Sequence, residues 1–168
     1  MRKLLFLAFV SMSMIGCGGG GSAENDTSDS AAPAPAPAAM EVPKSVELVI
    51  EGSDQMKFNL ASLEVKAGQE VTLTLKHVGE LPIESMGHNW VLLKKGVDKA
   101  DFASAAINAK ENGYIPQDRL DDVVAYTETI GGGAETTITF TAPAKGTYDY
   151  ICTFPGHYGL MKGLFKVK

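Results

Sequence analysis

The residues best suited to chemistry lie close together near the C-terminus, in the segment Cys152-Thr-Phe-Pro-Gly-His157-Tyr-Gly-Leu-Met161. A thiol, an imidazole and a thioether therefore follow one another with gaps of four and three residues. Thiolate and thioether sulfur favour copper, and imidazole suits both of its common oxidation states. Because Pro155 and Gly156 lie between the Cys and the His, we expect a strand to end at Cys152 and a loop to follow it. The segment predicts that three ligands of one copper ion converge.

A second imidazole must come from elsewhere in the chain, which has three histidines. His88, in the segment Met86-Gly87-His88-Asn89-Trp90, stands at the head of a predicted strand. Two imidazoles, one thiolate and a weak axial methionine form the trigonal arrangement of blue-copper sites. His88 is therefore a candidate for the second imidazole beside Cys152, His157 and Met161. Trp90 is expected to be a buried core residue.

The segments that must position these residues have the pattern of β-strands. Val71, Leu73 and Leu75 alternate with threonines, which is the period of two of a half-buried strand. Other strand-like segments cover residues 46–50, 89–93, 123–129, 136–141, 148–152 and 164–167. Turn residues such as the glycines at 131–133 separate them. Residues 45–168 are therefore expected to form one all-β domain, a sandwich or a barrel.

One segment has a helical pattern instead. Phe102, Ala105, Ala106 and Ala109 are spaced as on one apolar helical face. Asp98 could cap the start of this helix and Gly113 could close its end. We therefore expect one short helix inserted between strands. The acidic stretch at 118–122 is expected to be a solvated loop.

Three motifs together resemble the azurins, which are type 1 blue-copper proteins of the cupredoxin family. They are Gly-His-Asn-Trp-Val at 87–91, Cys-Thr-Phe-Pro-Gly-His at 152–157 and Leu-Met-Lys-Gly at 160–163. The likeness extends to residues 54–58 and 81–82, and so covers residues 46–168. Plastocyanin-like and amicyanin-like proteins have a shorter gap from Cys to His. The resemblance implies an all-β, cupredoxin-like Greek-key β-sandwich with one inserted short helix.

The same resemblance implies roles for individual residues around one copper ion that cycles between Cu(II) and Cu(I). His88, Cys152 and His157 would be equatorial ligands, Met161 the long axial ligand, and the carbonyl of Gly87 would lie opposite it. The backbone N–H groups of Asn89 and Phe154 would point at the thiolate sulfur and tune the site. Around His157, an apolar patch for docking partners would consist of Met56, Leu81, Met86, Phe154, Gly156 and Leu160.

The function implied by the resemblance is one-electron transfer, without enzymatic activity. The partners would be redox proteins such as c-type cytochromes or membrane oxidoreductases and reductases, which would dock on the apolar patch. Nucleic acid is not expected as a partner. Removal of residues 1–16 lowers the basic residues from 15 to 13 against 20 acidic residues, which gives a net charge of −7.

Three other functions remain alternatives. A copper oxidase or reductase needs a second copper with its own histidines, and only His77 would be left for it. A Cys–His hydrolase has no use for a methionine ligand and a second histidine. Copper storage or delivery usually involves several Cys or Met ligands, although zinc could occupy the same site. Transfer of Cu(I) to an apo-chaperone would favour this last alternative.

The N-terminal segment resembles a bacterial lipoprotein signal. Arg2 and Lys3 precede an apolar run from residue 4 to 15, and Gly16-Cys17 ends it. We therefore expect residues 1–16 to be removed and Cys17 to carry lipid; an ordinary secretory peptide with an incidental Cys is the alternative. Residues 17–44, rich in Gly and Ala-Pro, would form a tether with a reach of roughly 30 Å. The predicted location is the periplasm or cell envelope, with the protein anchored by lipid to a membrane, as in the tethered auracyanins.

Two further features concern stability and titration. Azurins have a disulfide near the start of the domain, and the cysteines for it are absent here. Loss of a native disulfide typically costs about 2–5 kcal/mol, so lower stability is expected. His77 resembles a histidine that titrates near the copper of azurins. A pH switch there predicts that His77→Ala changes the pH slope of the redox midpoint, whereas a structural histidine predicts equal slopes.

Overall fold

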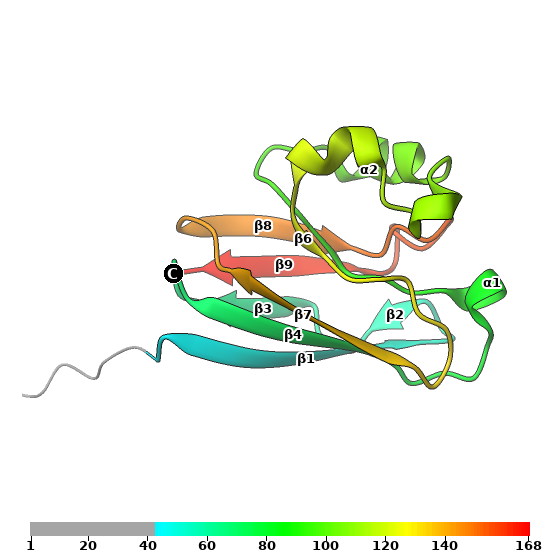
Figure 1. Ribbon diagram of the computed structural model, residues 1–168, viewed down its shortest axis with the longest axis horizontal. Helices are drawn as coiled ribbons and strands as arrows, with labels where there is room; N and C mark the ends of the chain where they lie inside the picture. The colour runs from blue at the N-terminus through cyan, green and yellow to red at the C-terminus, as the bar shows by residue number, and fades with distance from the viewer. Residues whose placement is uncertain (1–42) are drawn as a thin grey trace, which may run out of the picture. The chain divides into compact units, whose positions relative to one another are not determined.

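The computed structural model describes residues 43–168, which form two β-sheets packed as a sandwich (Figure 1). The first sheet has the strand order β2 (Lys57–Phe58), β1 (Ser45–Ser53), β4 (Glu70–His77) and β7 (Glu135–Thr141). The second has the order β3 (Ser62–Val65), β9 (Lys162–Val167), β8 (Gly146–Ile151), β5 (Val91–Leu93) and β6 (Val123–Tyr126). Both sheets are mixed, because β1 pairs with β4 and β3 with β9 in parallel. The expected cupredoxin-like sandwich is confirmed.

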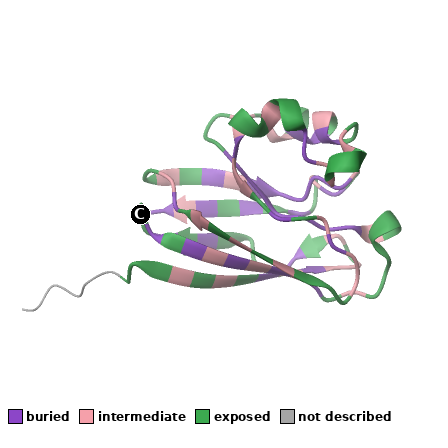
Figure 2. Cartoon of the chain, in the orientation of Figure 1, coloured by how far each residue is buried: buried purple, intermediate pink, exposed green. Residues whose placement is uncertain are grey.

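The core lies between the sheets and follows the alternation seen in the sequence (Figure 2). Along β4, Val71, Leu73 and Leu75 are fully buried, while the threonines between them are half-buried. Trp90 is also fully buried, and its ring packs against those of Phe140, Tyr150 and Phe165. Removing a buried aromatic side chain of this kind typically costs about 3–5 kcal/mol. The core therefore fixes the strand ends that carry the candidate ligands.

Most predicted strands are present, but the strand predicted for residues 89–93 is shorter. It begins at Val91, because the backbone N–H of Trp90 donates to the Thr127 hydroxyl at 2.9 Å instead of to a strand carbonyl. The strand predicted for residues 123–129 correspondingly ends at Tyr126. The two short strands β2 and β3 were not predicted, because β2 has only two residues and β3 only four.

The sequence predicted one inserted helix, and the described residues form that helix, α2 (Lys99–Ala106), and a second short one. The Asp98 carboxylate caps α2 by accepting from the N–H groups of Ala100 and Asp101. Phe102 and Ala106 are buried as expected, but the helix stops before Ala109. The chain then forms a 3₁₀ turn, η1 (Lys110–Asn112), and Gly113 closes that turn with a left-handed φ of 62°.

Two other helical elements were not predicted from the sequence. The single-turn helix α1 (Ile83–Met86) is too short to show an apolar period. The 3₁₀ helix η2 (Gln117–Asp122) replaces the solvated loop expected at 118–122. Arg119 bonds Asp101 and Asp122 there and lies over the Phe102 ring, so it joins η2 to α2.

Among the described residues, no helix has both the length and the apolar character needed to cross a bilayer. The signal peptide predicted at 1–16, the lipidated Cys17 and nearly all of the predicted tether lie outside the described residues. These remain expectations from the sequence.

Candidate metal centre

Three of the candidate ligands lie on one tight connection between neighbouring strands. Cys152 directly follows β8, and Met161 directly precedes β9, its antiparallel neighbour. The Cys152 N–H donates to the Met161 carbonyl at 2.9 Å, and the Met161 N–H donates to the His157 carbonyl at 2.8 Å. These backbone bonds fold the loop back on itself, so the thiol, imidazole and thioether predicted from the motif come together.

The fourth candidate comes from a distant part of the chain. His88 follows α1 and exchanges both backbone hydrogen bonds with Ile130, at 2.9 and 2.8 Å. The imidazole of His88 is fully buried. The nearby backbone is equally crowded, since a Cβ on Gly52 would lie 2.7 Å from His88 Cδ2 and 3.2 Å from Met161 Cε. Gly52 therefore leaves room for His88 and Met161 side by side.

The donor atoms converge on one point. One ligand atom each from His88, Cys152 and His157 lies within 4.8 Å of the other two. Cys152 Sγ is 3.7 Å from His157 Nδ1 and 4.0 Å from the carbonyl oxygen of Gly87. Cys152 and Met161 are fully buried, and His157 is only 3% exposed. The structure thus brings together the residues that the sequence placed at the site, with Gly87 beside them.

The contacts of His88 allow a tautomer in which its Nδ1 can bind a metal. Its Nε2 lies 2.9 Å from the carbonyl oxygen of Ser53, and its Nδ1 lies 2.9 Å from that of Gly87. A neutral ring can donate to only one of these two acceptors. In the tautomer that donates from Nε2 to Ser53, the lone pair of Nδ1 is left for a metal. Metal-binding histidines are commonly oriented in this way through the other nitrogen. Ser53 gave no signal in the sequence, because it acts through its backbone.

Burial sets the protonation states of the ligands. It raises the pKa of the Cys152 thiol to about 12, against the opposing effect of the N–H groups of Asn89 and Phe154 that point at the sulfur. Burial also lowers the pKa of His157 to about 4, helped by His88 and His77, and lowers the pKa of His88. Both imidazoles are thus neutral near pH 7, whereas the thiol keeps its proton until a cation replaces it.

A network around Asn89 ties the two ligand loops together. The Asn89 Oδ1 accepts from the Thr153 N–H at 2.8 Å, and its Nδ2 donates to the Thr153 hydroxyl at 2.8 Å and to the Gly113 carbonyl at 3.1 Å. Thr153 in turn donates to the Tyr114 carbonyl. The sequence predicted only a backbone role for Asn89. The position of Thr153 beside Cys152 was the available signal for its part in the network.

Gly87, whose carbonyl lies beside the Cys152 sulfur, is closely packed against Phe154. A Cβ on Gly87 would lie 2.7 Å from the Phe154 ring, so only glycine fits there. The Phe154 ring packs against the rings of His157 and Tyr114, with centroids 4.7 and 5.0 Å apart. Phe154 therefore holds the His157 ring as well as supplying an N–H to the sulfur.

His77 lies directly behind His88. The two rings stack with centroids 4.2 Å apart and planes 8° apart. His77 Nε2 donates to the Met86 carbonyl at 2.8 Å, while its Nδ1 accepts from the Gly79 N–H at 3.1 Å. The Asp54 carboxylate oxygen Oδ1 lies 4.0 Å from His77 Nε2. Both ring nitrogens are therefore used in a buried structural contact, and the role of His77 as a pH switch remains a hypothesis.

Of the predicted docking residues, Phe154, Gly156 and Leu160 lie on the loop that carries His157, and the residues of the set differ in exposure. Leu81 is 42% exposed and Leu160 is 64% exposed, and Gly156 is exposed as well. Met56 and Met86 are half-buried, while Phe154 is buried. Ile83 on α1 is also exposed, at 40%, and the single turn of this helix gave no apolar pattern in the sequence.

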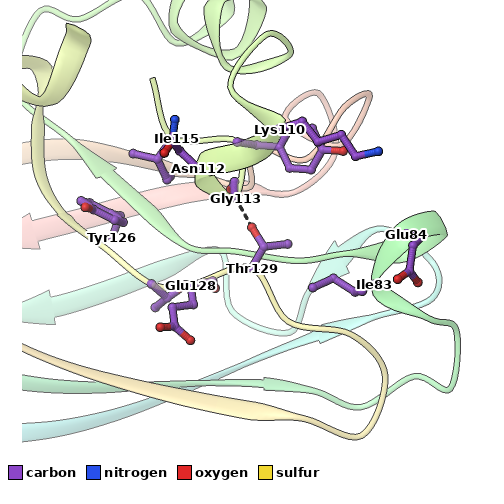
Figure 3. Close-up of a pocket in the computed structure, with 11 residues that line it drawn as sticks. Ile83, Glu84, Lys110, Asn112, Gly113, Ile115, Tyr126, Glu128 and Thr129 are labelled. Atoms are coloured by element: carbon purple, nitrogen blue, oxygen red, sulfur yellow. Dashed lines mark hydrogen bonds between the residues drawn. The ribbon is translucent and has the colours of Figure 1, made fainter. Parts of the chain in front are cut away.

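A separate pocket of about 430 Å³ lies beside the site, between α1, η1 and the segment after β6 (Figure 3). The Thr129 hydroxyl donates to the Gly113 carbonyl in its wall, at 2.7 Å. Its lining includes Lys110, Glu84 and Glu128 but none of the four candidate ligands. The pocket is therefore next to the metal centre and distinct from it.

The donor set fits one copper ion. A thiolate and a thioether are soft ligands, and two neutral imidazoles complete a His₂Cys set with Met161 beside it. Among the described residues, no other group of His, Cys, Asp and Glu side chains converges as a metal site. Oxygen ligands typical of magnesium or calcium are absent from this set.

Comparison with known proteins supports the same interpretation. Residues 44–168 match the family model for copper-binding proteins of the plastocyanin/azurin family. An azurin of Achromobacter denitrificans is 39% identical over 130 residues, which cover 72% of this chain and 83% of that protein. Outer membrane protein H.8 of Neisseria gonorrhoeae is 43% identical over 118 residues, 68% of this chain but only 63% of that protein.

A solved structure shows the same fold. Auracyanin A, a blue copper protein from Chloroflexus aurantiacus, superposes with a TM-score of 0.68 and 37% identity. The match covers 74% of this chain and 99% of the solved chain of auracyanin A. With its sandwich, its converging donors and these matches, the chain belongs to the plastocyanin/azurin family of copper-binding proteins.

Proposed function

We propose that this protein carries single electrons between redox proteins through one copper ion held by His88, Cys152, His157 and Met161. The observation that carries the proposal is the convergence of the His₂Cys donors within 4.8 Å in an azurin-family domain. The Gly87 carbonyl, whose oxygen lies 4.0 Å from Cys152 Sγ, would be a further weak ligand of the ion. A bound copper ion would supply the one-electron couple between Cu(II) and Cu(I).

The contribution of the chain is to hold the donors in one arrangement. The Ser53 carbonyl orients His88, the backbone bond between Cys152 and Met161 closes the ligand loop, and Asn89 joins that loop to the His88 segment. Two N–H groups directed at the Cys152 sulfur stabilise the thiolate. Donors that are already fixed need little rearrangement when the charge at the site changes.

Electrons would enter and leave through His157. Its ring is 3% exposed, and the exposed Leu81, Gly156 and Leu160 lie on loops at the same end of the domain. Exposed apolar residues of this kind are typical of small, transient interfaces. Partners such as c-type cytochromes or membrane oxidoreductases and reductases would dock there and approach His157 closely.

An enzymatic role has no support. The chain is an azurin-family electron carrier and not an enzyme. The third histidine, His77, bonds the backbone with both ring nitrogens, so it does not provide a second copper site. Copper storage is also disfavoured, because the site offers one buried thiolate and one thioether instead of several exchangeable sulfur ligands.

We also propose that lipid on Cys17 anchors the protein to a membrane of the periplasm or cell envelope. The support is the signal-like sequence before Cys17 and the match to a protein named as an outer membrane protein. Mass spectrometry of the chain purified from a bacterial membrane tests this. A mass that includes acyl chains and lacks residues 1–16 is expected, whereas an unmodified Cys17 would contradict the anchor.

The electron-transfer proposal is tested by mixing the reduced copper protein with an oxidised c-type cytochrome. Leu160→Glu should slow electron transfer at least tenfold, because it places a charge in the apolar contact, while the copper spectrum stays unchanged. Val49→Glu is the matched control, since Val49 is 48% exposed on β1 away from the ligand loops. Equal rates for both variants would contradict docking near His157. No electron transfer by the wild-type protein would contradict the proposed function.

A further inference from the structure

Lysines gather at the end of the sandwich opposite the metal centre. Strand β8 begins at this end and runs to Ile151, just before Cys152, so about 20 Å of strand separates the two ends. Figure 1 shows the start of β1, the C-terminus and the start of β8 together at this end. The side chains that form what we call the basic end are Lys44, Lys66, Lys95, Lys145, Lys166 and Lys168.

Backbone contacts confirm that these lysines are neighbours although they are far apart in sequence. The Glu70 N–H donates to the Lys44 carbonyl at 2.9 Å, and the Ala67 N–H donates to the Lys168 carbonyl at 3.1 Å. Lys95 Nζ donates to the Lys145 carbonyl at 3.0 Å. Five of the six lysines are exposed and Lys166 is half-buried. The basic end is therefore one continuous surface built from the ends of five strands and their turns.

The charge of this end is opposite to that of the rest of the domain. Residues 43–168 contain 13 basic and 16 acidic side chains, a net charge of −3. At this end the six lysines and Lys94, whose N–H donates to the Asp122 carbonyl, stand with five carboxylates (Glu47, Glu64, Glu70, Asp121 and Asp122), which gives +2 there and leaves −5 elsewhere. Such a separation of charge orients a protein in the field of a charged surface. An anionic surface would attract the basic end and repel the end that carries the metal centre.

The chain enters the domain at the same end. Pro43, the first described residue, is held by a hydrogen bond of 2.8 Å from the Gln69 side-chain Nε2 to its carbonyl. Pro43, Lys66 and Lys168 border a shallow hollow of about 310 Å³, together with Glu64 and Gln69. The segment that would lead to a lipidated Cys17 therefore starts among the lysines. The membrane that holds the lipid would lie nearest to this end.

We propose that the basic end binds the anionic headgroups of that membrane and holds the domain with its His157 end facing away from the bilayer. The proposal rests on the lipid anchor proposed above. A tether makes the contact intramolecular and gives the domain an effective concentration of roughly millimolar, so weak attraction is sufficient. Each lysine near an anionic surface strengthens binding roughly fivefold. In this orientation the electron partner reaches His157 from the aqueous side.

The test measures partition of the protein onto vesicles at low salt. The chain from residue 17 onward with Cys17→Ser keeps the tether but takes no lipid, so its binding reports the protein surface alone. Vesicles of phosphatidylcholine with half phosphatidylglycerol are compared with pure phosphatidylcholine. The test variant is K44E/K66E/K145E, because none of these three side chains makes a hydrogen bond or ion pair within the described domain. The control K57E/K110E/K162E changes the net charge equally at the other end, at exposed lysines.

We expect partition that requires phosphatidylglycerol, falls at least tenfold in K44E/K66E/K145E and changes less than threefold in the control. High salt should remove it, because headgroup attraction is screened. Equal losses in both variants would show that net charge alone acts, and would overturn the proposal. Absence of phosphatidylglycerol-dependent partition by the parent chain at roughly millimolar phosphatidylglycerol, the effective concentration that the tether would supply, would overturn it as well. Neither result depends on lipidation of Cys17 or on electron transfer, so failure of the anchor or of the carrier function is detected separately.

Discussion

The Asn89 side chain bonds Thr153 twice, accepting from its backbone N–H and donating to its hydroxyl, both at 2.8 Å. Asn89 follows His88 and Thr153 follows Cys152, so the pair fastens two ligand segments that are 64 residues apart. Both residues are buried. The relative position of an imidazole and a thiolate therefore depends on one amide side chain.

Asn89→Ala should destabilise the protein and loosen the site. It leaves the buried Thr153 N–H without a partner, which typically costs about 1–3 kcal/mol. Thermal unfolding followed by circular dichroism should show the loss, and the copper protein should show a shifted, broader thiolate absorption. Asn59→Ala is the matched control, because Asn59 bonds Glu51 at an exposed site and should change stability by at most about 0.5 kcal/mol. A control that loses as much stability as Asn89→Ala would contradict a special role of the network.

Gly52→Ala should weaken metal binding. The new Cβ would lie 2.7 Å from the His88 ring and 3.2 Å from Met161 Cε, and the strain of such overpacking is typically about 1–3 kcal/mol. Copper affinity measured by competition with a chelator should fall about 5- to 150-fold if that strain acts on the bound state. Gly159→Ala, where a Cβ meets nothing within 4 Å, should bind as the wild type does. Unchanged affinity in Gly52→Ala would mean that His88 and Met161 are not held as described.

Metal binding should release about one proton at pH 7. The thiol of Cys152, with its pKa raised to about 12 by burial, is protonated before binding, whereas His157, with its pKa lowered to about 4, is neutral. Zinc is a suitable probe because it does not oxidise the thiol. Titration of the apo-protein with zinc in weakly buffered dye solution measures the protons. Cys152→Ser should release none, and release of two or more protons by the wild type would contradict neutral imidazoles.

The apo-protein should lose stability as the pH falls below neutrality. Burial lowers the pKa of His157 to about 4, while an unfolded histidine titrates near 6.5, so the unfolded chain takes up its proton at the higher pH. The free energy of unfolding therefore falls with pH through this window, and the stabilising contribution is lost once the pH drops below about 4. Urea unfolding at pH 7, 6 and 5 measures this. His157→Gln should show a shallower dependence, and an equally steep one would contradict the assignment.

The sequence predicted the site better than it predicted the elements around it. Cys152, His157 and Met161 lie on one short loop, and a strand-loop-strand connection brings them together with little dependence on the rest of the fold. The long alternating strand β4 was equally clear, since its buried positions follow a strict period of two. Local information was sufficient in both cases.

Features that depend on tertiary contacts could not be predicted. The Ser53 carbonyl orients His88 through its backbone, and no side-chain pattern reports that. The turn α1 is held by its own backbone bonds to Pro82, and η2 by pairing of Arg119 with Asp101 on a different helix. The side-chain network of Asn89 likewise requires knowing that Thr153 and Gly113 lie beside it.

The central claim, a thiolate–copper site built on Cys152, is tested most directly by the visible spectrum of the protein loaded with Cu(II), beside a Cys152→Ser variant. We expect an intense blue absorption band in the wild type that disappears in the variant. A colourless wild-type protein that binds copper only weakly, or a blue band that survives in Cys152→Ser, would contradict it.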